Sequence, residues 1–196
     1  MKKLSGSGLL ISSLLLTSAL ASTQVSAANY IIDTEYAHAS INFKIKHLGY
    51  SWLTGRFNKL EGSFNYDDKD ISNSSIKVSI APESIDTNHA EREKHLKSKK
   101  YLNTDEFSKV TFISTKITDK GNNKLSLQGD LTLHGVKKNV TIDAVKIGEG
   151  KDPWGGYRVG FTGTTTLKLT DFGYTFDLGP ASKEVELTLN IEGVRQ

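Results

Sequence analysis

Cysteine is absent from this chain of 196 residues, and methionine and proline are scarce, with one and three residues respectively. The absence of cysteine excludes a disulfide scaffold, a thiolate zinc site, an iron–sulfur cluster, a thiol nucleophile and a lipidated N-terminal cysteine. A large excess of one charge is also missing, because 25 Lys and Arg face 22 Asp and Glu. Hydrophobic residues make up 37% of the chain, or about 42% when glycine is added and tyrosine left out, which is close to the norm of a globular domain and makes disorder, collagen and coiled coil poor descriptions. The length fits one domain.

The first 27 residues have the pattern of an export signal. Lys2 and Lys3 precede an almost wholly apolar run over residues 9–20, which is shorter than the ~20 residues of a membrane span. We therefore expect a signal peptide over residues 1–27, cut after Ala27, and one mature domain over 28–196; the alternative is an uncut membrane anchor. The mature chain keeps 23 basic against 22 acidic residues, so a broad electrostatic footprint for nucleic acid is absent.

Alternation of apolar and polar residues dominates the mature chain, and this period of two is typical of half-buried strands. Turn signals separate the alternating segments, for example Asp119–Asn123, His134-Gly135 and Asp177–Pro180. We expect about eight strands, with 30–36 as a short lead-in and a last strand at 184–194; the others lie near 39–47, 54–66, 75–81, 109–118, 124–134, 138–147 and 157–171. The apolar set changes parity between Phe112 and Ile113 in 110–118 and between Ala144 and Val145 in 140–147, which indicates a β-bulge or a strand covered on both faces.

Residues 88–101 interrupt this pattern. They lack β-branched residues and are rich in helix formers, and Asn88 with Glu91 is spaced as a capping box. The expected architecture is all-β: one antiparallel sandwich or barrel of about eight strands with one inserted α-helix.

Residues with catalytic or metal-binding chemistry do not form a recognisable motif. The five histidines have no zincin spacing, and no G-x-S-x-G elbow or G-K-[ST] phosphate loop occurs. We therefore expect no catalytic residue, no metal site and no cofactor. An eight-stranded barrel either fills with side chains or holds one small ligand, and the inward set here is apolar. From the residues alone, a solid packed core and a cavity for an apolar ligand are about equally compatible with this barrel.

Five short segments in order carry a resemblance across the whole mature chain. They are His47–Trp52, Ser84–Leu96, Gly129–Val136, Asp152–Gly156 and Asp177–Ser182. Together they closely resemble the YceI family of exported bacterial proteins. The resemblance implies a lipocalin-like antiparallel β-barrel in the periplasm, whose apolar tunnel binds, stores or transports an isoprenoid quinone, its precursor or a polyprenyl phosphate. It does not imply catalysis.

Two sets of candidate ligand-binding residues follow from strand parity and from side-chain chemistry. The apolar tunnel set is Ile41, Phe43, Ile45, Phe64, Ile76, Val78, Ile80, Phe112, Leu127, Leu131, Leu133, Phe161, Leu187 and Leu189. The mouth set combines an apolar body with a polar tip, or a guanidinium that suits a phosphate, and comprises His47, Trp52, His89, Arg92, Trp154 and Arg158.

The sequence is compatible with three functions. The first is a periplasmic carrier of an isoprenoid lipid or quinone. Such a carrier is expected to contact the membrane transiently and to form a homodimer, and no binding of nucleic acid is expected. The second is an enzyme that acts on a lipid head group, with His47 or His89 as general base. The third is a protein-binding module that uses the helix at 88–101.

Overall fold

The computed structural model describes residues 27–175 and 179–196. Residues 1–26 of the predicted signal peptide, and Asp177 and Leu178 of the predicted turn, lie outside the described residues. Nowhere in the described ranges is there a helix of the length and apolarity needed to cross a bilayer.

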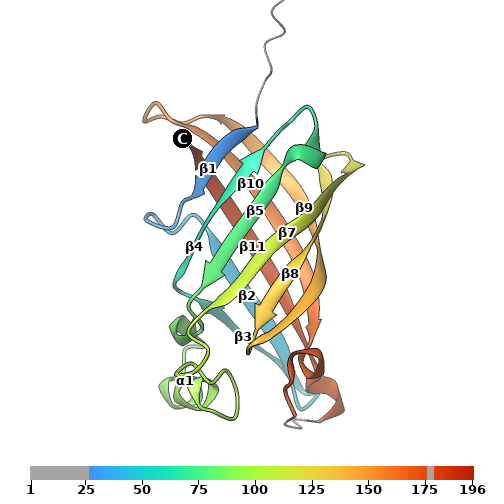
Figure 1. The fold of residues 1–196 in the computed structure, drawn as a ribbon. Coiled ribbons are helices and arrows are strands. Elements are labelled where there is room, and N and C mark those ends of the chain that lie inside the picture. Colours follow the sequence, from blue (N-terminus) through green and yellow to red (C-terminus); the bar gives the residue numbers. More distant parts are fainter. Residues whose placement is uncertain (1–26, 176–178) are drawn as a thin grey trace, which may run out of the picture.

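Eleven strands and five short helices are assigned in the described residues (Figure 1). The strands are β1 (Ala28–Ile32), β2 (Ser40–His47), β3 (Ser51–Phe57), β4 (Leu60–Tyr66), β5 (Ser75–Ile80), β6 (Ile85–Asp86), β7 (Val110–Gly121), β8 (Lys124–Leu133), β9 (Val136–Lys151), β10 (Tyr157–Lys168) and β11 (Glu184–Arg195). The helices are α1 (Ala90–Lys97) and four 3₁₀ turns, η1 (Ile71–Asn73), η2 (Pro82–Ser84), η3 (Leu169–Phe172) and η4 (Pro180–Ser182).

The sheet closes into an antiparallel barrel, which confirms the expected fold class. Its strand order is β1-β4-β5-β7-β8-β9-β10-β11, and β1 also pairs with β11, so these eight strands form a ring. Strands β2, β3 and β6 extend the sheet from β11. We call the end that carries α1, η3 and η4 the helix end, and the opposite end, with the β9–β10 connection at 152–156, the hairpin end (Figure 1).

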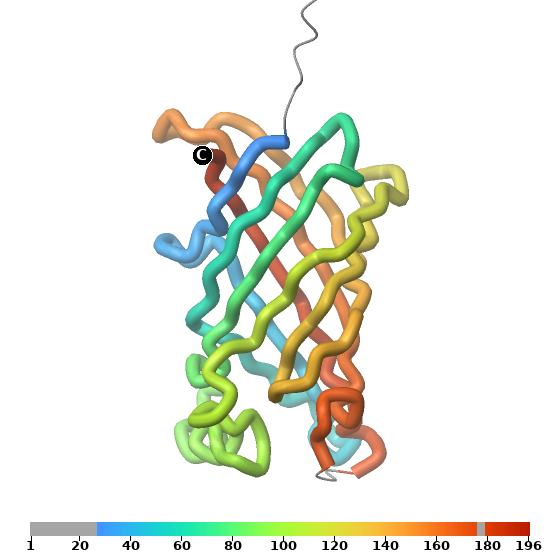
Figure 2. The backbone as a smooth tube through the Cα atoms, in the orientation of Figure 1, coloured from blue at the N-terminus to red at the C-terminus, as the bar shows by residue number. Residues whose placement is uncertain are grey.

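Strand β11 has two partners on one of its edges. Tyr30 of β1 pairs with Arg195 near the hairpin end, and Ile45 of β2 pairs with Val185 near the helix end. Residues 33–39 leave the wall between these two pairings and form a loop outside the barrel (Figure 2). The lead-in expected over 30–36 therefore ends at Ile32.

The single strand expected over 54–66 is wrong, because the chain forms two strands there. β3 pairs with β2 and β6, whereas β4 pairs with β1 and β5. At the break, the Asn58 N–H donates to the Ser84 carbonyl and the Lys59 N–H donates to the Ser84 hydroxyl. Asn58 is the turn-forming residue at this change of partners, and no glycine or proline stands beside it at 58–59, so the turn signal in the sequence is weak.

The inserted helix is present but shorter than the expected 88–101, and its cap differs from the expected one. His89, not Asn88, is the N-cap, and its Nδ1 accepts a hydrogen bond from the Arg92 N–H. Glu93, not Glu91, reaches back to accept from the N–H groups of Thr87 and His89. The cap thus lies one residue later than expected, and Asn88 takes a left-handed φ of 60° in the turn before it.

Both expected irregular strands contain a bulge. In β7 the register skips Thr115, between Ser114 and Lys116, later than the expected position between Phe112 and Ile113, and Ile113 faces solvent. In β9 the skipped residue is Ile147, later than the expected position between Ala144 and Val145. Val145 and Ile147 are exposed because the strand keeps its parity up to Lys146.

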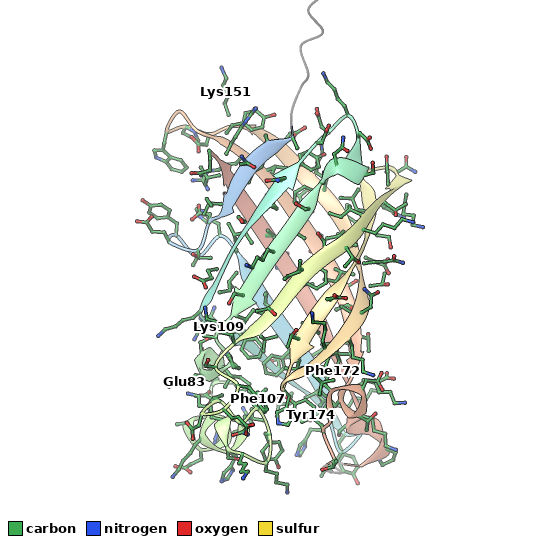
Figure 3. All side chains as sticks on the ribbon, in the orientation of Figure 1. Glu83, Phe107, Lys109, Lys151, Phe172 and Tyr174 are labelled. Atoms are coloured by element: carbon green, nitrogen blue, oxygen red, sulfur yellow. The ribbon has the colours of Figure 1, made fainter. Side chains whose placement is uncertain are left out.

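The helix end of the barrel is filled by side chains. Phe172 is 2% exposed and belongs to a buried cluster with Val110 and Leu167. Phe107 and Tyr174 lie near it at this end (Figure 3). The His134 ring lies between these two rings, at 4.7 Å and 4.8 Å between ring centres. Burial raises the pKa of Tyr174 to about 12. This packing closes the barrel at the helix end.

Glycines beneath phenylalanine rings allow the wall to curve around a compact interior. A Cβ on Gly129 would collide with the Phe112 ring and lie 2.6 Å from the Ile113 carbonyl oxygen. A Cβ on Gly193 would likewise collide with the Phe64 ring, and a Cβ on Gly55 with the Phe43 ring. Each ring therefore rests on bare backbone of a nearby strand.

We predict that Gly129→Ala lowers the free energy of unfolding by about 1–3 kcal/mol, because the added methyl has to displace both a ring and a backbone carbonyl. Urea denaturation followed by circular dichroism measures the change. Gly148→Ala is the matched control, since no atom lies within 4 Å of its Cβ position, and a change within about 0.5 kcal/mol is expected there. Equal stability of the two variants would contradict the prediction.

Candidate functional site

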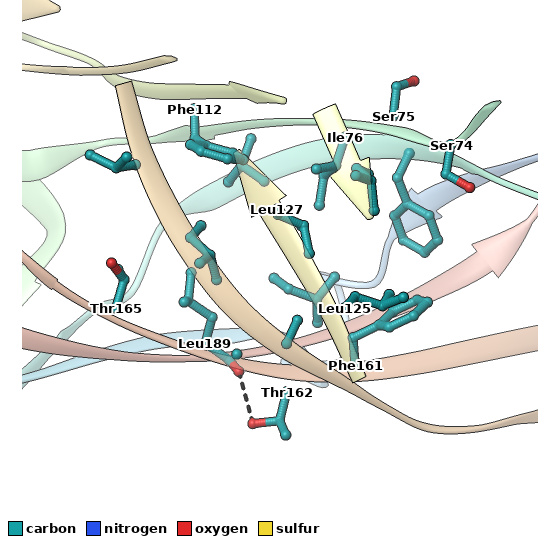
Figure 4. Close-up of a pocket in the computed structure, with 18 of the residues that line it drawn as sticks. Ser74, Ser75, Ile76, Phe112, Leu125, Leu127, Phe161, Thr162, Thr165 and Leu189 are labelled. Carbon is teal, nitrogen blue, oxygen red and sulfur yellow. Dashed lines mark hydrogen bonds between the residues drawn. The ribbon is translucent and has the colours of Figure 1, made fainter. Parts of the chain in front are cut away.

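An apolar cavity of about 120 Å³ lies inside the barrel (Figure 4). Inward side chains from the strands around the ring line it, and nearly all of this lining is hydrocarbon. The cavity reaches the hairpin end, where its lining includes Tyr66, Ile71 and Ser74. Thr162 also belongs to the lining, and its hydroxyl donates to the Leu189 carbonyl, so this polar group is already satisfied.

The cavity is long and narrow. On β8 its lining runs from Leu125 to Leu131, which corresponds to about 20 Å of strand at ~3.3 Å per residue. Its volume is close to that of an engineered cavity of about 150 Å³ that holds benzene. A slot of this shape suits a thin, flexible hydrocarbon better than a compact ring system.

Most residues of the predicted tunnel set lie on this cavity. Those that line it are Ile41, Phe64, Ile76, Val78, Ile80, Phe112, Leu127, Leu131, Phe161, Leu187 and Leu189. Phe43, Ile45 and Leu133 do not line it. Phe43 packs against Phe57 at 5.8 Å between ring centres, Ile45 pairs with Leu53 in the β2–β3 extension, and Leu133 packs on the cluster at the helix end.

Sequence reasoning missed several lining residues. They include Ile117, Leu125, Val140, Ile142, Ala144 and Ile191. Leu125 and Ile191 share the parity of predicted residues on their own strands, so the alternation pattern could have identified them. Ala144 and Ile142 were obscured by Val145 and Ile147, which are apolar although they face solvent.

Charged side chains meet the cavity at its hairpin end. Lys146 pairs in register with Phe161, so both side chains face the interior. The Lys146 ammonium lies 5.5 Å from the centre of the Tyr66 ring and 2.9 Å from Glu149 Oε1. Burial alone would lower the pKa of Lys146, but hydrogen bonds to Glu149 and Tyr66 raise it above its usual value. Lys146 therefore remains a cation at the edge of an apolar cavity.

A second cation lies at the same end. Arg195 shares the inward parity of Ile191 and Gly193 on β11, and its guanidinium lies 5.8 Å from the centre of the Tyr157 ring. The Tyr30 hydroxyl is close enough to this group that Arg195 and Glu149 both influence its pKa, which burial raises. The charges of Lys146, Glu149 and Arg195 sum to +1.

The six predicted mouth residues do not form one rim, and none of them lines the cavity. His47 and Trp52 lie at the helix end, on the β2–β3 hairpin, where the Lys44 ammonium is 4.5 Å from the centre of the Trp52 ring. His89 caps α1, and Arg92 donates to the Thr87 carbonyl and hydroxyl. The two histidines that were candidate general bases are therefore both exposed and away from the cavity.

Trp154 and Arg158 do lie at the hairpin end, but on the outer face of the barrel. Trp154 is 78% exposed, and the Arg158 guanidinium lies 5.6 Å from the centre of its ring. Arg158 donates to three carboxylates: Asp152 Oδ2 at 2.8 Å, Glu192 Oε1 at 2.6 Å and Asp33 Oδ2 at 2.5 Å. Val159, the next residue along the strand, is buried inside, so Arg158 points away from the cavity.

This arginine controls the protonation of two buried carboxylates. Burial alone would raise the pKa of Asp33, but hydrogen bonds from Arg158 and His38 hold it below its usual range. Burial alone would also raise the pKa of Asp152, but hydrogen bonds from Arg158 and from the Gly156 N–H lower it. Both carboxylates are therefore charged at neutral pH and stabilise the fold in that state.

Asp33, His38 and Glu192 are the three residues, within the part of the chain that the structure describes, whose ligand atoms lie close enough together to hold a metal ion. The Arg158 guanidinium already hydrogen-bonds both carboxylates of this group. A fixed cation thus occupies the position that a metal ion would need, so we assign the group a structural role.

Comparison with known proteins gives consistent matches. The model of the YceI-like domain family matches residues 30–193. A UPF0312 protein of Shewanella putrefaciens is 54% identical, with 95% of this chain and 98% of the relative covered, and that of Shewanella denitrificans is 52% identical with the same coverage.

Solved structures share the barrel. A YceI protein of Campylobacter jejuni superimposes with a TM-score of 0.71 at 25% identity, over 78% of this chain and 90% of the other. BcnA of Burkholderia cenocepacia gives 0.73 at 20% identity, over 82% and 98%. A domain of Saccharophagus degradans, described as polyisoprenoid-binding and implicated in plant cell wall breakdown, gives 0.60 at 14% identity, over 87% and 99%.

We predict that Arg158→Met lowers the free energy of unfolding by roughly 2–3 kcal/mol at neutral pH. This value is below the usual cost of breaking a buried ion pair, because the Arg158 side chain is 18% exposed. The loss arises because Asp33, whose side chain is 4% exposed, stays charged without its main partner. Arg56→Met is the control, since the exposed Arg56–Asp86 pair at 3.8 Å contributes at most about 1 kcal/mol.

The pH dependence of the same variant provides an independent check. The pKa of Asp33 is lower in the folded protein than in the unfolded chain, where it is about 4. The charged carboxylate therefore stabilises the fold above about pH 4, and this stabilisation is lost as the pH falls through the pKa of Asp33 in the folded protein. The stability difference between the wild-type protein and Arg158→Met should therefore shrink below about pH 4. Thermal unfolding over an acid pH series measures it, and a difference that stays constant would refute the assignment.

Proposed function

Since this chain belongs to the family of YceI-like domains, we propose that it binds an isoprenoid lipid in the apolar cavity of its barrel. The observation that carries the proposal is the long, narrow, hydrocarbon-lined cavity with a charged end. The proposed ligand is an isoprenoid quinone, its precursor or a polyprenyl phosphate. The Saccharophagus domain described as polyisoprenoid-binding shares this fold, and at 14% identity that likeness extends to the fold alone.

Burial of hydrocarbon supplies the binding energy. Each CH₂-sized group moved from water into an apolar site contributes about 0.8 kcal/mol, so every isoprene unit adds several times that amount. The methyl branches of such a chain fit between the inward leucine, isoleucine and phenylalanine side chains. Because the cavity is only about 120 Å³, a long chain also requires some of these side chains to rotate.

We propose binding rather than catalysis as the activity of this site. Within the described residues, the cavity lining contains no histidine and no carboxylate, so a general base is absent from its wall. Carriage or storage of the lipid in the periplasm agrees with the export pattern of residues 1–27. The sealed helix end and the polar hairpin end suit a ligand that enters tail first.

We predict that Ala144→Phe weakens binding of a quinone analogue with a short isoprenoid tail at least tenfold. Ala144 is 7% exposed and lines the cavity, so a phenyl ring there fills space that the tail needs. Val145→Phe is the matched control, since the neighbouring side chain is 37% exposed on the outer face. Quenching of tryptophan fluorescence measures affinity, and urea denaturation confirms that both variants are folded.

The wild-type protein should also carry a prenyl compound when it is purified from its own host. Organic extraction and mass spectrometry identify that compound. Failure to find a lipid in the extract, together with no uptake of the analogue, would overturn the proposed function. Equal affinity of Ala144→Phe and Val145→Phe would instead place the ligand outside the cavity.

A further inference from the structure

The hairpin end of the cavity holds an unusual combination of groups. Elsewhere the lining is hydrocarbon, but here Lys146, Glu149 and Tyr66 meet at its edge. The bulge at Ile147 follows directly, and it brings Glu149 opposite Val159, a residue that is 1% exposed inside the barrel. Lys146 and Glu149 therefore face the interior from either side of the bulge and form their ion pair at the end of the cavity.

This ion pair leaves the lysine with donor capacity for a further acceptor. A lysine ammonium has three hydrogens to donate, and Glu149 and the Tyr66 hydroxyl account for two of them. The Lys146 side chain is 21% exposed, so its ammonium is partly removed from water and gains from another acceptor. Arg195 adds a second cation at this end, and the three charges sum to +1.

We propose that this group, Lys146 with Arg195, Glu149 and Tyr66, is the head-group subsite of the bound lipid and that it selects a phosphate. The inference rests on the proposed function, because it assumes an isoprenoid tail in the cavity. An isoprenoid phosphate places its hydrocarbon among apolar side chains and its oxyanion beside a cation that already lies there. Within this group two cations face one carboxylate, which favours this anion over a neutral alcohol of the same length.

Glu149 limits the strength of this site. Its carboxylate neutralises Lys146 when no lipid is bound and repels a phosphate that approaches the same ammonium. The pair lies near the surface, with Glu149 26% exposed, so the carboxylate can rotate into water when the phosphate replaces it. Release of the lipid then restores the original ion pair. Such competition keeps binding reversible, as a carrier requires.

Affinities for farnesyl phosphate and farnesol, two probes with the same tail, test the proposal. We expect the wild-type protein to prefer the phosphate by tenfold or more, and Lys146→Met to lose most of that preference while its affinity for farnesol changes little. Lys146→Arg should keep the preference, and Glu149→Gln should increase it several-fold. Lys137→Met is the matched control, because Lys137 is exposed at the opposite end of the same strand and should leave both affinities unchanged.

Each outcome has a distinct meaning. If Lys146→Met weakens both probes equally, Lys146 acts through the structure of the barrel and the subsite is refuted. If the wild-type protein binds farnesol or a neutral quinone analogue as tightly as the phosphate, the selection of an anion is refuted while the lipid-binding function stands. If the wild-type protein binds none of the three probes, the proposed function itself fails. Titration at 50 and 500 mM salt adds a check, since only the phosphate preference should shrink.

Discussion

The shared edge of β11 is the constraint on which the rest of this structure depends. Two strands, β1 and β2, lie one after the other along that edge, so the chain has to leave the wall between them at residues 33–39. The loop is held where it starts, since the Asp33 N–H donates to the Glu192 carbonyl and the Asp33 side chain receives Arg158 from β10. Arg158 also binds Asp152 of the β9–β10 connection. One guanidinium on the outer face thus joins three parts of the closed sheet and leaves the interior to hydrocarbon.

How much of this fold could be predicted from the sequence depends on what sets each feature. Strand parity is local, so alternation identified the strands and most of the inward residues, Leu127 and Leu131 among them. The break between β3 and β4 arises from a change of pairing partner, which a lone Asn58 signals only weakly. The position of the second bulge was equally hidden, because Val145 and Ile147 are apolar residues on the solvent side.

The charged end of the cavity was missed for a related reason. Residues with an apolar body and a polar tip were expected at the mouth, and this criterion selected Trp154 and Arg158. Trp154 is exposed in the β9–β10 connection, and the parity of Arg158 places it on the outer face of the barrel. Lys146 carries no such signal, since a lysine in an alternating strand is expected to face water. Its inward position follows from its pairing with Phe161, and the pairing partner becomes known only when the sheet is assembled.

Widening of the narrow cavity must involve some side chains more than others. Phe112 and Phe64 rest on the bare backbone of Gly129 and Gly193, so these rings have no space behind them into which to retreat. Phe161 instead packs edge-on against other rings, 5.9 Å from Phe64 and 5.4 Å from Tyr66. Phe161 and Tyr66 are therefore the rings best able to move, and both lie at the hairpin end beside Lys146. These rings thus belong to the same group of residues as the charge that we propose meets a head group, and on that proposal recognition of the head group and opening of the cavity are coupled.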